Sequence, residues 1–196
     1  VAAFLSDEDE RVALEAARVI WDKPLPEANN VLASLIDKTN FLSDPLLRRV
    51  LAANITGRTH VNLKAVINFG CRADISPALR ELAWDLVRNW ASSPPRDSVY
   101  GDWRPLEPRP KEELIAALQA SMSQIVETSV TSPAGLIVAA EMGLEAAYPP
   151  LVKIVTGSSH PEEVRARGLA AFKHANESSV KQVIDANFHS KDALVR

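Results

Sequence analysis

Residues 76–90 constrain the fold of this chain more strongly than any other segment. Their apolar side chains recur at intervals of three and four, which places them on one face of an α-helix. Ser76 is suited to accept a hydrogen bond from an N–H of the first turn, and Pro77 occupies a position where a missing N–H costs nothing. Such a helix is stable only when neighbours cover its apolar face. The residues of this face are Leu79, Leu82, Ala83, Leu86, Val87 and Trp90.

The same helix-start signal recurs along the chain, at Asp44-Pro45, Ser132-Pro133 and His160-Pro161. Outside one long gap that holds an insertion, the spacing of these signals falls in the range of helical-hairpin repeats. Apolar residues at helical intervals follow each signal, and similar patterns begin at Ser6 and Pro26. The predicted helices cover residues 6–20, 26–36, 44–55, 63–67, 76–90, 110–125 (as one long helix), 132–144, 150–155, 160–172 and 180–188.

Composition fits a chain of this kind and excludes several functions. A length of 196 residues allows a sizeable core, and 46% hydrophobic with 24% charged residues is ordinary for a globular protein. The formal net charge of −3 gives no broad attraction for phosphate backbones, so nucleic acid is not an expected partner. No run of 18 apolar residues predicts a membrane span. The single Cys71 excludes an internal disulfide and a cysteine-rich metal site.

Residues 91–109 interrupt the helical rhythm. The segment is rich in proline, but Val99, Tyr100, Trp103 and Leu106 make it too apolar for a solvated linker. We therefore predict a packed insertion loop.

The insertion loop also holds the candidate site. Aromatic residues in and near it are suited either to form a recognition surface or to pin the loop onto the helices, and we prefer the second interpretation. For its charged residues the alternatives are a polar binding site, or ion pairs and turn caps, and again we prefer the second. The aromatic residues are Trp84, Trp90, Tyr100 and Trp103, and the charged ones Arg96, Asp97, Asp102 and Arg104. The predicted protein-binding residues are Arg96, Tyr100, Trp103 and Arg104.

No residue pattern predicts catalysis, a cofactor or a metal site. The four histidines are not paired at i, i+4, as a helical metal site requires. The serine pairs lack the Gly-x-Ser-x-Gly context of a nucleophile elbow, and the acidic residues 7–10 lack the spacing of a calcium loop. The chain is therefore predicted not to be an enzyme and to hold no cofactor.

The repeated units resemble HEAT repeats, a family in which two helices per repeat stack side by side. The likeness rests on an acidic turn, often with proline, followed by a Val-Arg start to the inner helix. It is carried by Asp7…Arg11-Val12, Asp44-Pro45…Arg48 and His160-Pro161…Val164-Arg165. The resemblance implies an all-α fold, a right-handed α-solenoid of about five helical hairpins with one Pro-rich insertion. It also implies that arginines such as Arg48, Arg49, Arg80, Arg88, Arg165 and Arg167 decorate a concave face.

A narrower resemblance concerns the insertion and its flanks, residues 90–109. They are similar to an insertion found in HEAT segments of large exported bacterial proteins, which often join a sugar-dehydrogenase-like β-propeller, a HEAT segment and a c-type haem domain. No Cys-x-x-Cys-His occurs in this chain to attach haem. This likeness implies a periplasmic or exported location and an oxidoreductase activity that belongs to the longer parent protein.

We predict a single HEAT-like domain over residues 1–196. Because Val1–Leu5 resemble the end of an outer helix and Val195-Arg196 the first turn of an inner one, we interpret the chain as a fragment of a longer polypeptide. The leading function is a non-catalytic scaffold that binds a protein or a neighbouring domain of the same chain. The alternatives are a HEAT-like nucleic-acid-binding or DNA-repair enzyme and a spacer module of a sugar-dehydrogenase/cytochrome protein.

Overall fold

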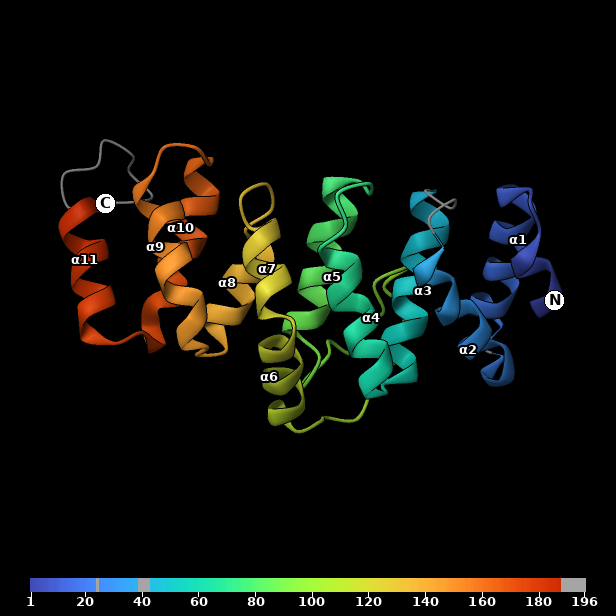
Figure 1. Ribbon diagram of the computed structural model, residues 1–196. Coiled ribbons are helices and arrows are strands. Elements are labelled where there is room, and N and C mark those ends of the chain that lie inside the picture. Colours follow the sequence, from blue (N-terminus) through green and yellow to red (C-terminus); the bar gives the residue numbers. More distant parts are fainter. Residues whose placement is uncertain (24, 39–42, 188–196) are drawn as a thin grey trace. The chain divides into compact units, whose positions relative to one another are not determined.

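The computed structural model describes residues 1–23, 25–38 and 43–187 (Figure 1). This described part contains eleven α-helices, four short 3-10 helices and no β-strand, which confirms the all-α prediction. None of its helices combines the length and apolar character that a membrane span requires. Predictions that concern Phe188, Val195 and Arg196 lie outside the described residues.

Contacts between Cα atoms divide the chain into two units, and each is described by itself. The first unit, Val1–Ala117, packs successive helices against one another (Figure 1). Helix α3 contacts α1, α2, α4 and α5, so it lies at the centre of this unit. The elements are η1 (Ala2–Ser6), α1 (Glu10–Asp22), α2 (Pro26–Ala33), η2 (Ser34–Asp37), α3 (Asp44–Gly57), α4 (His60–Gly70) and α5 (Pro77–Arg88), with the start of α6 (Lys111–Ala120).

Helix α5 begins as its sequence predicts. The Ser76 hydroxyl accepts a hydrogen bond from the Leu79 amide at 3.3 Å, and Pro77 is the first helical residue. Trp84 is buried, and its indole N–H donates to the carbonyl of Gly70 at 3.0 Å, which joins α5 to the end of α4. A Cβ at position 70 would lie 2.8 Å from the Trp84 ring, so the two helices approach this closely only because residue 70 is glycine.

Asn54 connects three helices of the first unit through buried hydrogen bonds. Asn54 is only 2% exposed. Its Nδ2 donates to the carbonyls of Ala33 and Val50, each at 2.9 Å. Its Oδ1 accepts from the side-chain amide of Asn62 at 2.9 Å. Asn62 also forms the capping box of α4 with Thr59. The end of α2, the middle of α3 and the start of α4 are therefore held in register by one polar network.

The second unit begins at Leu118 and also consists of packed helices. Helix α8 is buried over its whole apolar stretch, while α9 contacts both α10 and α11. Arg165 of α10 is 8% exposed, and its Nε donates to the carbonyl of Val155 at 3.2 Å. Gly168 lets α10 approach α9, because a Cβ there would lie 2.6 Å from a methyl group of Val155. The elements are α7 (Met122–Thr128), α8 (Ala134–Glu141), η3 (Glu145–Ala147), α9 (Tyr148–Thr156), α10 (Glu162–Ala170), η4 (Ala171–His174) and α11 (Glu177–Asn187).

The structure corrects several local predictions. The long helix predicted over 110–125 is wrong, because α6 ends at Ala120 and α7 starts at Met122. The Ser121 amide donates to the carbonyl of Leu118, a bond of the 3-10 type that tightens the turn and interrupts the α-helical ladder.

Four of the predicted helix caps are also wrong. Asp9 caps α1 in place of Ser6, since its carboxylate accepts from the Arg11 amide at 2.9 Å. Asp44 lies inside α3 rather than before it. Pro133 and Pro161 occupy the cap positions assigned to Ser132 and His160.

We predict that Asn54→Ala lowers the free energy of unfolding by roughly 2–3 kcal/mol, because it leaves the buried Ala33 carbonyl and Asn62 amide without partners. Urea denaturation followed by tryptophan fluorescence measures the change. The matched control is Asn30→Ala on the exposed side of α2, for which a change within about 0.5 kcal/mol is expected. Equal losses for the two variants would contradict the role assigned to Asn54.

Candidate binding site at the insertion loop

Arg104 attaches the insertion loop to the first unit. Its Nη1 donates to the backbone carbonyl of Trp21 at 2.9 Å, and its guanidinium carbon lies 4.6 Å from the centroid of the Trp21 ring. The Nε of Arg104 lies 3.2 Å from Oδ2 of Asp97, and the Arg104 amide donates to the carbonyl of Pro95 at 2.8 Å. Through its side chain and its amide, Arg104 thus binds α1 and two other parts of the loop, and the loop packs against the first unit.

Asp97 shapes the loop around a tight turn. Its Oδ1 accepts from the amides of Val99 and Tyr100, both at 2.8 Å, and its side chain is 6% exposed. The Asp97 amide donates to the carbonyl of Asp102 at 2.9 Å, and Gly101 takes the positive φ of 76° that closes the turn. The preferred interpretation of the charged residues as ion pairs and turn caps is therefore confirmed for Asp97 and Arg104.

Arg49 of α3 makes a second attachment. It is 5% exposed, its Nη1 donates to the carbonyl of Pro45 at 2.7 Å, and its Nη2 donates to the hydroxyl of Tyr100. Its guanidinium carbon also lies 5.1 Å from the centroid of the Tyr100 ring. The prediction that Arg49 decorates an exposed face is wrong, and it is wrong for the buried Arg165 as well.

The two ends of the loop meet at a third attachment beside Trp90. The Arg109 amide donates to the carbonyl of Ala91 at 2.8 Å, and the Arg109 guanidinium lies 5.9 Å from the centroid of the buried Trp90 ring. Arg58 donates to the Trp90 carbonyl at 3.4 Å. Partial burial lowers the pKa of Arg58, and repulsion from Arg109 lowers this pKa further. Because arginine ordinarily titrates far above neutral pH, Arg58 remains a cation despite this shift.

The aromatic residues named from the sequence separate into two groups. Trp84 and Trp90 are buried in the first unit, which excludes them from any recognition surface, and the Trp84 indole donates to Gly70 of α4. Tyr100 and Trp103 remain 54% and 67% exposed. The interpretation that the aromatic residues pin the loop therefore fails for Trp103.

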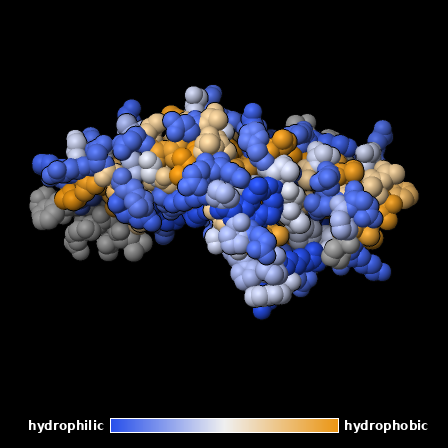
Figure 2. Space-filling model, turned by 90° about the horizontal axis from the view of Figure 1, so that it is seen from below, coloured by the Kyte–Doolittle hydropathy of each residue, from blue (hydrophilic) through white to orange (hydrophobic). Residues whose placement is uncertain are grey.

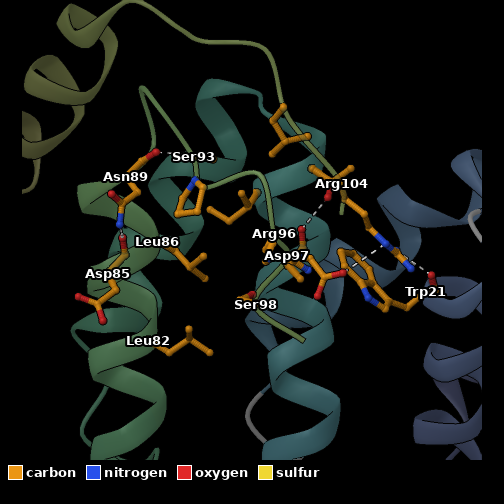
Figure 3. A pocket seen from close by; sticks show the side chains of 15 residues that line it. Trp21, Leu82, Asp85, Leu86, Asn89, Ser93, Arg96, Asp97, Ser98 and Arg104 are labelled. Carbon is orange, nitrogen blue, oxygen red and sulfur yellow. Dashed lines mark hydrogen bonds and ion pairs between the residues drawn. The ribbon is translucent and has the colours of Figure 1, made fainter. Parts of the chain in front are cut away.

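The anchored loop closes one side of a cavity of about 240 Å³ (Figure 3). Helix α5 forms another side, and Figure 3 shows Leu82 and Leu86 pointing from this helix toward the loop. The lining surface is mostly apolar. The cavity is lined by Trp21, Ala52, Ile55, Thr56, Leu82, Asp85, Leu86, Asn89, Ser93, Pro94, Arg96, Asp97, Ser98, Arg104 and Leu106.

The charged groups of the lining are largely paired with one another. Asp97 lies against Arg104, and Asp85 accepts a hydrogen bond from Arg88. Arg96 is exposed, and in the described part of the chain its side chain donates only to the carbonyl of Gly101, at 2.7 Å. It is therefore the one cation of the lining whose charge no described carboxylate balances.

Sequence reasoning placed Leu82 and Leu86 in the buried face of their helix, and the structure corrects this. Both are half-buried, because the loop stands away from them and leaves the cavity between. Trp21 and Ile55 were not foreseen as site residues, since α1 and α3 bring them from distant parts of the sequence. No periodic pattern within a single segment identifies them, because they come together only in the folded chain.

We also searched the described residues for metal-binding clusters and for reactive cysteines. Among the residues described, no three or more His, Cys, Asp or Glu side chains come together in a way that would hold a metal ion. Cys71 is buried.

Comparison of the chain with known protein families, with curated proteins and with solved structures found no match. Its function is therefore argued from its own residues.

We predict that Arg104→Ala releases the insertion loop and lowers the free energy of unfolding by roughly 1–3 kcal/mol, because a charged hydrogen bond and its ring contact are lost together. Cleavage by trypsin after Arg96 should become faster by tenfold or more. Urea denaturation and timed digestion followed by mass spectrometry measure the two effects.

Arg18→Ala is the matched control for this prediction, since it removes an arginine whose ion pair with Glu15 lies on the surface of α1. Its digestion rate after Arg96 should equal that of the unaltered protein. If Arg104→Ala behaves as this control does, Arg104 does not anchor the loop.

Proposed function

We propose that this chain is a non-catalytic scaffold that binds another protein through the insertion loop of a HEAT-like α-solenoid. The solenoid is supported by the pattern of helix contacts, since α1, α3 and α5 contact in sequence order and α2 and α4 pack between them along the chain. Stacked hairpins of this kind offer extended surfaces for protein partners.

The single observation that carries the proposal is the exposure of Tyr100 and Trp103 on a loop that is otherwise fixed. Three arginine-centred attachments hold the loop, at Arg104, Arg49 and Arg109. Large aromatic side chains on a rigid support bury much area at little cost in conformational entropy, and they dominate many protein interfaces. Of the four predicted protein-binding residues, Arg96 and the two aromatic residues are available for a partner, while Arg104 positions them.

The spacer-module alternative is favoured by a different surface. Figure 2 shows apolar side chains gathered at the end of the first unit that η1 and α1 form. Phe4, Val12 and Val19 are exposed there, and the buried Ala16 of α1 lies beside the two valines. In a spacer, a neighbouring domain of the same polypeptide covers this face. Isolation of the native protein with an antibody to this chain tests the alternative, which requires a mass several times larger and covalent haem.

The nucleic-acid alternative loses part of its basis. It needs a continuous stripe of exposed arginines, and Arg49 and Arg165 of the predicted set are buried. Arg88 is paired with Asp85. We therefore propose no nucleic-acid function.

We predict that Trp103→Ala weakens binding of the protein partner by tenfold or more, because loss of a central aromatic contact at an interface costs about 2 kcal/mol or more. The partner is first purified from the source on the immobilised chain, and its affinity is then measured by calorimetry. The control Val61→Ala removes an equally exposed apolar side chain from α4 and should leave the affinity unchanged. A partner that binds both variants equally well would contradict a role for the loop.

A further inference from the structure

The cavity behind the insertion loop has the size of an anchor pocket for one side chain. Its volume of about 240 Å³ exceeds the roughly 150 Å³ that suffices for a benzene molecule in an engineered protein cavity. Ile55, Leu82 and Leu86 supply apolar surface from two helices, and Leu106 supplies more from the loop. Leu82 and Leu86 are only half-buried, so an apolar side chain that enters would remove further area from water.

The charges around the cavity favour an acidic group beside that side chain. Both carboxylates of the lining already face arginines, Asp97 with Arg104 and Asp85 with Arg88. The guanidinium of Arg96 is exposed and has only a carbonyl partner among the residues described. Guanidinium groups pair with carboxylates through two parallel hydrogen bonds, so a carboxylate is the group that Arg96 is best suited to bind.

The position of Trp103 links this cavity to the exposed surface of the loop. Arg96 and Trp103 face each other in an antiparallel β-bridge, and side chains opposite in such a bridge lie on the same face. A peptide that occupies the cavity and pairs with Arg96 therefore continues over Trp103, which is 67% exposed. A free small molecule would leave that aromatic surface uncovered, which favours a peptide as the occupant.

We propose that the cavity between α3, α5 and the insertion loop binds one bulky apolar side chain of a partner peptide, and that Arg96 binds the carboxylate of an Asp or Glu next to it. The proposal rests on the proposed protein-binding function and names the sequence class of the partner segment. Recognition joins an apolar anchor to a neighbouring acidic residue, so the site rejects basic and purely polar segments.

The test is titration of the isotope-labelled full chain with blocked tetrapeptides, followed by ¹⁵N–¹H NMR spectra. The probe Gly-Leu-Glu-Gly should shift the amide signals of Leu82, Leu86 and Ser98 at millimolar concentration. Replacing its Leu by Ser should weaken binding about tenfold or more, because the buried apolar group is lost. Replacing its Glu by Gln should weaken binding about two- to fivefold, the range of an exposed ion pair.

Variants of the protein complete the experiment. Arg96→Gln should abolish the preference for the Glu peptide over the Gln peptide while leaving the Leu-over-Ser preference intact. Leu82→Phe should fill part of the cavity and weaken binding of the Leu peptide. Val61→Phe, on the surface of α4, should leave this binding unchanged. Equal binding of the Leu and Ser peptides, or no shift at the cavity with either, overturns the proposal.

Failure of the pocket and failure of the proposed function give different results. If the cavity is not used, the peptides do not bind near Leu82, but Trp103→Ala still weakens binding of the purified partner. If the loop is not a binding surface at all, Trp103→Ala also leaves the affinity for the partner unchanged.

Discussion

The contact of the Arg104 guanidinium with Trp21 is the interaction on which the functional surface depends. A loop of this length without regular structure loses considerable entropy when it is ordered, and its own backbone hydrogen bonds are few. Arg104 supplies a ring contact, a carbonyl partner on α1 and an ion pair with Asp97. Because these contacts join the loop to α1, movement of the loop alters the packing of the first unit. The exposed aromatic side chains are held in place by the same contacts.

Most of the helices are predictable because the local spacing of apolar residues along the sequence indicates them. The apolar face of 76–90 and the pair Ser76-Pro77 predict α5 and its cap, and the structure confirms both. Helix ends were predicted less well. Whether Ser6 or Asp9 caps a helix depends on which residue first takes helical backbone angles, and tertiary packing decides this. The HEAT resemblance and the right-handed solenoid stay predictions.

The candidate site was predicted in part. Tyr100 and Trp103 were named from their apolar character in a proline-rich segment, and both are exposed. The roles of Arg104 and Arg49 were not visible, because their partners Trp21 and Tyr100 are far away along the chain. The cavity escaped prediction for the same reason. It exists where α1, α3, α5 and the loop fail to fill the space between them, and no single segment encodes such a gap.

The central claim is that residues 91–109 are as rigid as the helices that carry them and so present a fixed surface. The most direct test is measurement of backbone ¹⁵N order parameters across the full chain. Values near 0.85 from Asp97 to Arg104, equal to those of α5, are the predicted result. Values below about 0.6 in that segment would show a flexible loop and would contradict the account.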